Sequence, residues 1–346
     1  MRACCCKSKQ NRIITGVIFI VLLSNIALAG VGTESMQFLK IKPSARGASL
    51  GDGFVAVSDD VNAVFFNPAG LTQISALEIS LMHMVYMADT SYEYASLAMP
   101  IGDNLRFGAY IIYLNYGSIS KTSEDNTGMY QSSTESFSPN DLAVALSGAI
   151  RLGSNISLGV NLKYASESID TLSLTGIMAD AGILADLDGI KVGSSVYNIG
   201  VGNISNSPMG IRLGISSKIM LMAENDLTVA LGSNYVPAIS KMSGSIGVEW
   251  GYEEFLFLRS SYSLMSDSDS VNIGGGLKQD FGGMTGEIAY NFSMLGDLGS
   301  AHRISIGIKL GEGPGNYKGS KLKKSSGSKT APKKNYSTPA RKYNTR

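Results

Sequence analysis

Cysteine is missing from almost the whole chain. Its 346 residues include three cysteines, and all three, Cys4 to Cys6, stand before the first apolar run. Disulfides and thiol catalysis are therefore excluded from the rest of the protein. Histidine is nearly as scarce, being present only as His83 and His302, so no cluster has the spacing of a metal site. We expect neither a metal nor another cofactor.

Acidic residues are missing from both ends. Of the 29 Lys and Arg residues, four precede residue 13 and ten follow Glu312, whereas all 28 Asp and Glu residues lie between these points. The middle of the chain, with 15 basic residues, therefore has a net charge of −13. Residues 313–346 are rich in Lys, Ser, Gly and Pro, which predicts a disordered basic tail. An inert solvated tail and one that contacts anionic lipid or envelope polymer are both compatible with this composition. Nucleic acid is not an expected partner of an exported chain.

Long apolar runs are missing after the first 30 residues. Residues 1–29 combine four basic residues, an apolar run over Ile13–Leu23 and the small-residue pattern Ala27-Leu28-Ala29, which together predict a cleaved secretory signal peptide. An uncleaved anchor helix is the alternative, but the run is shorter than the about 20 residues that a membrane span needs. Later in the chain no apolar stretch reaches that length, which argues against helical spans.

The middle of the chain alternates apolar with small polar residues. This period of two marks β-strands, as in Ile156–Tyr164. Fourteen such segments are predicted, starting near residues 77, 91, 105, 141, 156, 172, 190, 209, 226, 243, 255, 271, 284 and 302. Short connections such as Asp188-Gly189 follow the even-numbered segments, and longer polar ones, the longest over residues 121–140, follow most odd-numbered segments. This asymmetry is typical of a transmembrane β-barrel, with both chain ends expected at the short-turn side.

The residue types on the second face of each segment favour a membrane barrel over a soluble sandwich or propeller. This face carries Gly, Ser, Ala and Asn rather than charged residues, and the 40 glycines suit a crowded interior. Tyrosines and the single tryptophan, Trp250, recur toward strand ends, as in the aromatic girdles of membrane barrels. The sequence thus predicts an all-β fold, a transmembrane antiparallel β-barrel of about 14 strands over residues 75–312, surrounded by outer-membrane lipid.

Residues 30–74 depart from the alternation. Ser58 is a predicted helix N-cap with Asp59 and Asp60 in the first turn, and Pro68 ends the helix because it disfavours helical geometry at the preceding residue. Gly70 is predicted to take a backbone conformation that residues with a Cβ rarely adopt. The segment precedes the first strand and is too short to be a domain. We therefore expect an N-terminal hatch that plugs the lumen.

The stretch FLKIKPSARGASLGDGFVAVSDDVNAVFFNPAGL resembles the N-terminal signature of the PorV/PorQ outer-membrane proteins, within the FadL-like (OMPP1/FadL/TodX) superfamily. The resemblance is strong over Gly32–Gln73 and only architectural afterwards. It implies a fourteen-stranded barrel with a lumenal N-terminal hatch. One departure is that the chain continues past Leu310, whereas such barrels commonly end on an aromatic residue. The hatch motif that the resemblance implies consists of Arg46, Gly51, Asp52, Asp59, Asp60, Asn67, Pro68, Ala69 and Gly70.

Two functions follow from the resemblance. FadL-like proteins pass hydrophobic molecules such as long-chain fatty acids across the outer membrane. The residues that would line an apolar pocket, or would simply pack the hatch, are Val64, Phe65, Phe66 and Leu71. PorV-like proteins instead receive exported proteins of a type IX-like secretion system at their outer loops. For that role residues 121–140 are the candidate contact, with Met129, Tyr130 and Phe137 among polar residues. We favour transport of hydrophobic molecules.

Catalytic interpretations have less support. Closure of a barrel would make the strands of His83 and His302 neighbours, but a Ser-His esterase needs a serine and an orienting polar group in contact with the histidine. RGASLGDG lacks the Lys-Ser/Thr of a phosphate loop. Asp267 and Asp269 fit a solvated acidic loop better than a Ca²⁺ site. We expect a protein that is not an enzyme.

Overall fold

The computed structural model describes residues 34–201, 207–222, 224–266 and 270–311. The predicted signal peptide, the basic tail and the pair Asp267 and Asp269 lie outside these residues.

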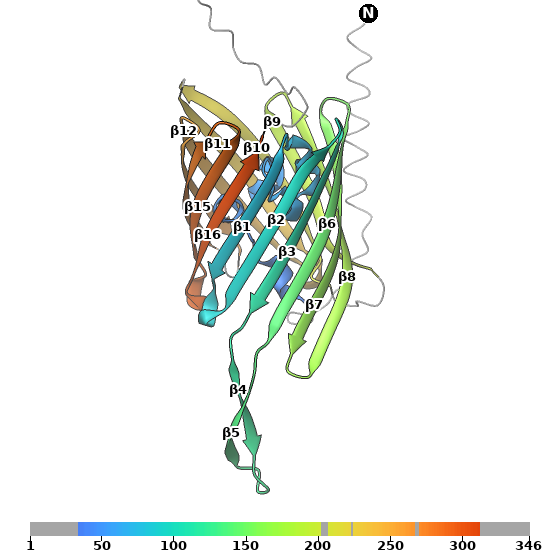
Figure 1. Cartoon of the computed structure of the whole chain (residues 1–346), viewed down its shortest axis with the longest axis vertical. Helices are drawn as coiled ribbons and strands as arrows, with labels where there is room; N and C mark the ends of the chain where they lie inside the picture. Colours follow the sequence, from blue (N-terminus) through green and yellow to red (C-terminus); the bar gives the residue numbers. More distant parts are fainter. Residues whose placement is uncertain (1–33, 202–206, 223, 267–269, 312–346) are drawn as a thin grey trace, which may run out of the picture. The chain divides into compact units, whose positions relative to one another are not determined.

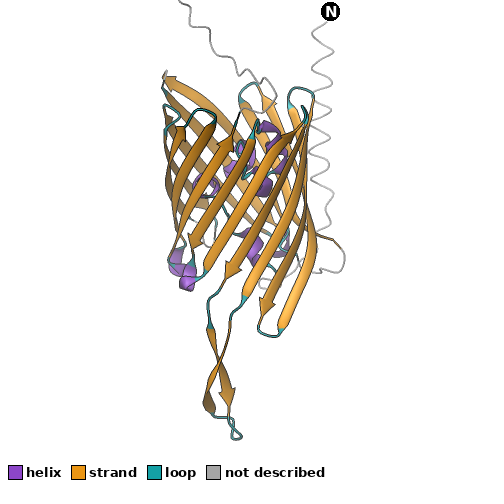
Figure 2. Ribbon diagram, viewed as in Figure 1, coloured by secondary structure: helices purple, strands orange, loops and turns teal. Residues whose placement is uncertain are grey.

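Fourteen strands close into one antiparallel barrel (Figures 1 and 2). Each strand pairs with the next along the chain, except that β3 pairs with β6, and the pairing of β1 with β16 closes the sheet. The barrel strands are β1 (Leu77–Val85), β2 (Ser91–Ile101), β3 (Leu105–Asn115), β6 (Asn140–Leu152), β7 (Ile156–Ile169), β8 (Leu172–Leu187), β9 (Ile190–Val201), β10 (Gly210–Met222), β11 (Asn225–Val236), β12 (Lys241–Tyr252), β13 (Leu256–Leu264), β14 (Val271–Asp280), β15 (Met284–Met294) and β16 (Ser300–Leu310). All fourteen begin within two residues of the predicted starts, which confirms the fold class.

The apolar face of the strands is the outer face. Leu81, Val160 and Ile306 are 54%, 60% and 50% exposed, whereas their chain neighbours point into the lumen and are mostly buried. A continuous apolar exterior of this kind is suited to lipid hydrocarbon and would be unfavourable in water. Within the described ranges no helix has the length and apolar character needed to cross a membrane.

The long connection after β3 contains structure that the sequence analysis missed. We expected a loop over residues 121–140, and this was wrong. β4 (Ile119–Glu124) and β5 (Tyr130–Phe137) pair into a two-stranded arm that projects past the rim of the barrel (Figure 1). The turn between them is fixed by the Asp125 carboxylate, which accepts from the Met129 and Thr127 backbone N–H groups at 3.0 and 2.8 Å. Short 3₁₀ turns occupy three other connections, η4 (Met87–Asp89), η5 (Pro237–Ile239) and η6 (Gly296–Leu298).

The residues before β1 fold inside the barrel. They form η1 (Gln37–Lys40), α2 (Ala45–Leu50), η2 (Gly51–Gly53), α3 (Phe54–Val57), α4 (Ala63–Phe66) and η3 (Pro68–Gln73). We call residues 34–74 the hatch. Its elements pack against the inner face of most strands: α2 against β12–β16, α3 against β9–β11, and η3 against β3 and β6–β8.

The hatch runs through the lumen from one end of the barrel to the other. The Met36 N–H donates to Glu167 Oε2 at 2.9 Å, near the long-loop end of β7. The chain then reaches the short-turn end, where β1 begins at Leu77 opposite Leu310 of β16. The strands therefore begin and end on the short-turn side as expected, but the first described residues of the hatch lie near the opposite end.

Two local predictions about the hatch were wrong. Ser58 is not a helix N-cap: it ends α3 in the left-handed region, with φ of 33°, and its hydroxyl donates to the Phe54 carbonyl at 2.8 Å. The next helix starts only at Ala63. Gly70 does not have a positive φ. It is required because a Cβ there would overlap the Ser58 carbonyl oxygen.

Candidate functional site: the hatch and the lumenal wall

Glycines of the wall let the hatch backbone approach the sheet closely. At several strand positions an added Cβ would collide with hatch atoms: Gly159 with Pro68 and Ala69, Gly182 with Asn67, Gly193 with Val55 and Ala56, Gly232 with Asp52 and Gly53, and Gly247 with Leu50. The high glycine content thus has a specific use. It leaves room at the level where the hatch fills the lumen.

The Asn67-Pro68-Ala69-Gly70 turn is tied to both hatch and wall. The Asn67 amide donates to the Val55 carbonyl at 2.9 Å and to the Ile183 carbonyl of β8 at 3.1 Å, and its oxygen accepts from the Ala69 N–H at 3.2 Å. One fully buried side chain therefore satisfies three backbone groups on three segments.

An ion network joins the hatch to the wall near the short-turn end. Arg46 donates to Glu249 of β12 through Nε and Nη2 at 2.8 and 2.9 Å, and to Asp59 and Asp60 through Nη1 at 2.5 and 2.8 Å. Arg259 of β13 then binds the same Glu249 at 2.6 Å. The predicted polar residues Arg46, Asp59 and Asp60 thus meet in one cluster. Such a buried, bidentate guanidinium and carboxylate pair holds its partners in one geometry.

The electrostatics of the three hatch residues follow from this packing. Burial raises the pKa of Asp60, and the nearby Asp59 charge adds to this effect although Arg46 opposes it. Burial would also raise the pKa of Asp59, but the Arg46 charge and hydrogen bond prevail, and the pKa of Asp59 is lowered. Burial disfavours the charged form of Arg46, yet Asp59 and Glu249 together raise its pKa above the usual value. The cluster keeps Arg46 charged at all ordinary pH values.

The other predicted acidic residue of the hatch lies apart from this network. Asp52 is buried and pairs with Lys42 at 3.5 Å, while its N–H donates to Ser245 Oγ of β12 at 2.9 Å. Gly51, next to it, has a φ of 65°, which favours glycine, and an added Cβ would press on Ser245. These residues anchor η2 to the wall.

The lumen also holds charged residues on the long-loop side of the hatch. Lys163 of β7 and Asp180 of β8 form a buried pair at 2.7 Å, and the Asn161 amide donates to Asp180 Oδ2 at 2.8 Å and to the Val64 carbonyl at 2.7 Å. The two charges of this pair neutralise each other. The Asn161 amide connects the pair to the backbone of α4 at Val64.

Arg212 of β10 differs, because no carboxylate pairs with it among the described residues. The side chain is 2% exposed and its Nε has no hydrogen-bond partner among the described residues. Its Nη1 makes a long contact of 3.5 Å to the Phe65 carbonyl. Three aromatic rings surround it: its guanidinium carbon lies 3.8 Å from the Tyr197 ring centre, 5.4 Å from that of Phe65 and 5.7 Å from that of Phe66. Cation–π contacts lessen the cost of burying this charge but do not neutralise it.

Other buried polar groups of the hatch and the wall also lack partners among the described residues. The Tyr94 and Tyr110 hydroxyls and Asn62 Oδ1 are buried, and each has no hydrogen-bond partner within the described part of the chain. Tyr110 packs edge-on against Phe65, with ring centres 6.0 Å apart, and Tyr94 lies 5.9 Å from Tyr110. Such groups are uncommon in native proteins and call for a ligand, water or a rearrangement.

The predicted apolar lining residues all lie buried inside the barrel. Val64, Phe66 and Leu71 are fully buried and Phe65 is 5% exposed. Phe66 packs edge-on against Phe54 at 4.9 Å between ring centres, so these side chains pack the hatch in this structure. Phe65 contacts both Arg212 and Tyr110.

Sequence reasoning missed Glu249, Arg259, Lys163, Asp180 and Arg212. Each is an inward-facing charged residue on a strand whose inner face is otherwise small and polar. That exception to the alternation pattern was the available signal, since a charge pointing into a packed lumen needs a partner.

The two histidines lie on the outside of the barrel near its long-loop end. His83 Nδ1 contacts Glu93 Oε1 at 2.7 Å, and His302 contacts the Tyr290 hydroxyl at 2.8 Å and Ser300 Oγ at 3.4 Å. All are exposed or half-exposed on the lipid-facing side. No group of His, Cys, Asp and Glu within the described ranges could hold a metal ion.

Comparisons with known proteins agree on the fold. An uncharacterised family, UPF0164, matches residues 28–171. No curated protein matches. Among solved structures, the toluene transporter TodX of Pseudomonas putida superposes with a TM-score of 0.53 at 13% identity, covering 83% of this chain and 99% of that one. The toluene transporter TbuX of Ralstonia pickettii (TM-score 0.49, 11% identity, 72% and 94% covered) and a FadL homologue of Pseudomonas aeruginosa (0.46, 10%, 78% and 98%) superpose less well. The chain folds as a closed fourteen-stranded barrel that resembles the fold of TodX.

Proposed function

We propose that this protein is an outer-membrane barrel that passes hydrophobic molecules with an acidic head, such as long-chain fatty acids, and that the hatch must move for passage. Support comes from the apolar exterior, from the lumenal hatch, and from the fold shared with a toluene transporter. The motif Arg46, Asp59, Asp60 and Asn67–Gly70 holds the closed hatch.

The proposed ligand class is based on the environment of Arg212. A guanidinium that is 2% exposed and lacks a carboxylate partner in the described chain is a site for an external anion. Aromatic rings and the apolar side chains of α4 surround it, so the matching ligand has a carboxylate at one end and hydrocarbon beyond. Arg212 lies two residues from the long-loop end of β10, so the proposed carboxylate site is on the outer side of the hatch.

Ligand pairs that differ only in the head group test this proposal. Purified protein is titrated with a long-chain fatty acid and with its methyl ester, and binding is followed by calorimetry. Wild type should bind the acid at least about tenfold more tightly, because a hydrogen bond to a charged group contributes about 1.5–3 kcal/mol. Arg212→Gln should remove this preference and leave ester binding unchanged. Equal binding of acid and ester by the wild type would reject Arg212 as the anion site.

The arm supports a second candidate, a PorV-like component that binds exported proteins. β4 and β5 each have one edge without a strand neighbour, and Met129 and Tyr130 at the tip are 67% and 74% exposed. Open edges and exposed aromatic residues favour strand addition by a partner chain. Pull-down from native envelopes with wild type and with a variant lacking residues 121–137 tests this role. Loss of captured secretion proteins in the variant would support it.

A further inference from the structure

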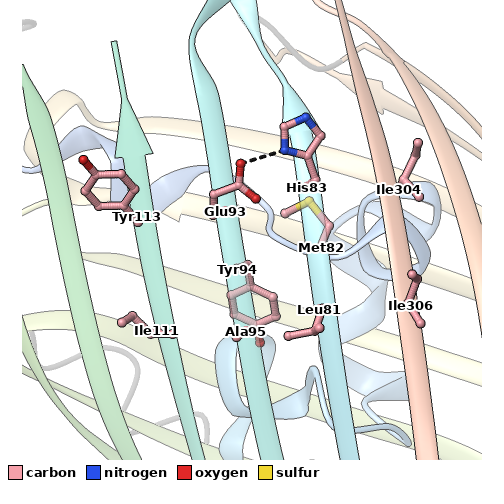
Figure 3. Close-up of a pocket in the computed structure, with 10 residues that line it drawn as sticks. All are labelled: Leu81, Met82, His83, Glu93, Tyr94, Ala95, Ile111, Tyr113, Ile304 and Ile306. Carbon is pink, nitrogen blue, oxygen red and sulfur yellow. Dashed lines mark hydrogen bonds and ion pairs between the residues drawn. The ribbon is translucent and has the colours of Figure 1, made fainter. Parts of the chain in front are cut away.

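A groove of about 470 Å³ lies on the outside of the barrel, where β16, β1, β2 and β3 run side by side (Figure 3). In the outward-facing row Ile306, Leu81, Ala95 and Ile111 are consecutive cross-strand neighbours. Ala95 is the one small residue in this row, so the space above its methyl group forms the floor of the groove. The walls are long aliphatic side chains, and their width suits an acyl chain.

The next outward row, toward the long-loop end, is polar. It consists of Ile304, His83, Glu93 and Tyr113, again consecutive neighbours across β16 to β3. Figure 3 shows His83 and Glu93 joined above the groove, with His83 Nδ1 and Glu93 Oε1 2.7 Å apart. Their side chains are 52% and 47% exposed on the lipid side of the wall. Below them, toward the short-turn end, the outward residues of β1 and β16 are aliphatic up to Ile79 and Leu310.

This arrangement places a carboxylate and an imidazole at the boundary of the apolar band. A carboxylate on the lipid face is more unfavourable at the bilayer midplane than near the interface. β1 ends two residues after His83, and Tyr113 stands in the same row as an interfacial aromatic residue. The pair is thus at headgroup depth, directly above a groove at acyl-chain depth.

We propose that this groove binds one membrane lipid with a phosphoethanolamine headgroup. The carboxylate of Glu93 accepts from His83 through Oε1, and no described residue donates to Oε2. A primary ammonium can donate a charge-assisted hydrogen bond to Oε2, whereas a quaternary ammonium has no N–H to donate. One acyl chain then lies over Ala95. The proposal depends on the membrane location of the barrel and is independent of transport through the lumen.

Native mass spectrometry of the full chain tests this assignment. The protein, released from detergent, is offered diacyl phosphoethanolamine and diacyl phosphocholine lipids with identical chains. Wild type should retain the ethanolamine lipid at least about fivefold more. Glu93→Gln keeps the shape of the side chain but lowers this preference to about one. Ala95→Phe fills the groove and should reduce retention of both lipids.

A matched variant separates the groove from general lipid contact. Ala181→Phe makes the same change on the outward face of β8, away from the groove, and should behave as wild type. Each variant is first checked for folding by its shifted migration on unheated gels. Equal retention of the two lipids by wild type, or an unchanged preference in Glu93→Gln, would overturn the proposal. If instead a free fatty acid displaces the ethanolamine lipid from wild type but not from Ala95→Phe, the groove is a site for hydrophobic cargo and the headgroup assignment is wrong.

Discussion

Arg46 of the hatch and Glu249 of the wall, 203 positions apart in the chain, share two hydrogen bonds, from Nε to Oε2 at 2.8 Å and from Nη2 to Oε1 at 2.9 Å. Glu249 is 4% exposed, and Arg259 donates to the same Oε2 at 2.6 Å. The hatch is therefore fixed to the barrel by a directional ionic contact as well as by apolar packing. Breaking this contact would remove the directional part of the attachment and leave the apolar packing in place.

Removal of Arg46 should loosen the hatch. Arg46→Met leaves Asp59, Asp60 and Glu249 with one cation fewer, and breaking a buried ion pair typically costs about 3–5 kcal/mol. Hydrogen exchange of peptides covering residues 45–66 should rise by roughly two orders of magnitude or more, while strand amides stay protected. The control is Lys218→Met, which removes an exposed pair with Asp226 at 3.0 Å and should change little. Unchanged exchange in the Arg46 variant would mean that apolar packing alone holds the hatch.

Gly70→Val should disturb the hatch through a steric clash. The new side chain would overlap the Ser58 carbonyl, which must move out of its present place. We expect normal amounts of folded barrel on unheated gels together with increased permeability to small dyes. Gly148→Val is the matched control, because a Cβ at Gly148 meets no atom within 4 Å. Loss of the folded barrel in Gly70→Val would instead make the hatch a folding nucleus.

Hatch closure should depend on pH through Asp60. Its folded pKa is raised by burial, so the docked hatch holds this proton more tightly than the free chain, and closure weakens as the pH rises above the usual value of 3.8 through the raised pKa. Asp59 acts in the opposite sense, since its pKa is lowered and its contribution is lost only as the pH falls below 3.8. Conductance of single barrels in a planar bilayer should show more openings well above pH 3.8 than at pH 3.8. Asp60→Asn should reduce this difference, and an unchanged pH response would exclude Asp60 as its source.

Protease access to the arm tests which end of the barrel faces the outside of the cell. A protease site inserted at Gly128, in the turn between β4 and β5, should be cut on intact cells, because the long connections face outward. A site at Asp188-Gly189, in the short turn between β8 and β9, should be protected until the cells are opened. Cleavage of both sites on intact cells would contradict the orientation, and so would the reverse pattern.

Much of the barrel could be predicted because its signals are local. Alternation fixes which residues of a strand share a face, and glycine and acidic turn residues mark the strand ends, so even short strands such as β13 begin within two residues of the predicted start. The arm was missed because β4 and β5 are rich in Ser and Thr with both faces exposed, which leaves no apolar alternation to detect.

The hatch was harder to predict because its structure depends on contacts with the wall. Ser58 looked like a helix N-cap from its neighbours alone, but packing against Gly70 and capping of α3 place it in the left-handed region. The partner of Arg46 is Glu249, and the environment of Arg212 is made by Phe65 and Tyr197. Such pairings between residues far apart in the chain are set by barrel closure and strand register, and residue types alone do not determine them.

The central claim, that this barrel passes hydrophobic acids past a movable hatch, is tested most directly by uptake. Cells that lack their own fatty-acid transporter would express the wild type, Arg212→Gln or an empty vector, and uptake of a labelled long-chain fatty acid would be measured at equal outer-membrane levels of protein. The account predicts saturable uptake by the wild type, well above the vector, and uptake reduced at least about fivefold in Arg212→Gln. Wild-type uptake equal to that of the empty vector would contradict it.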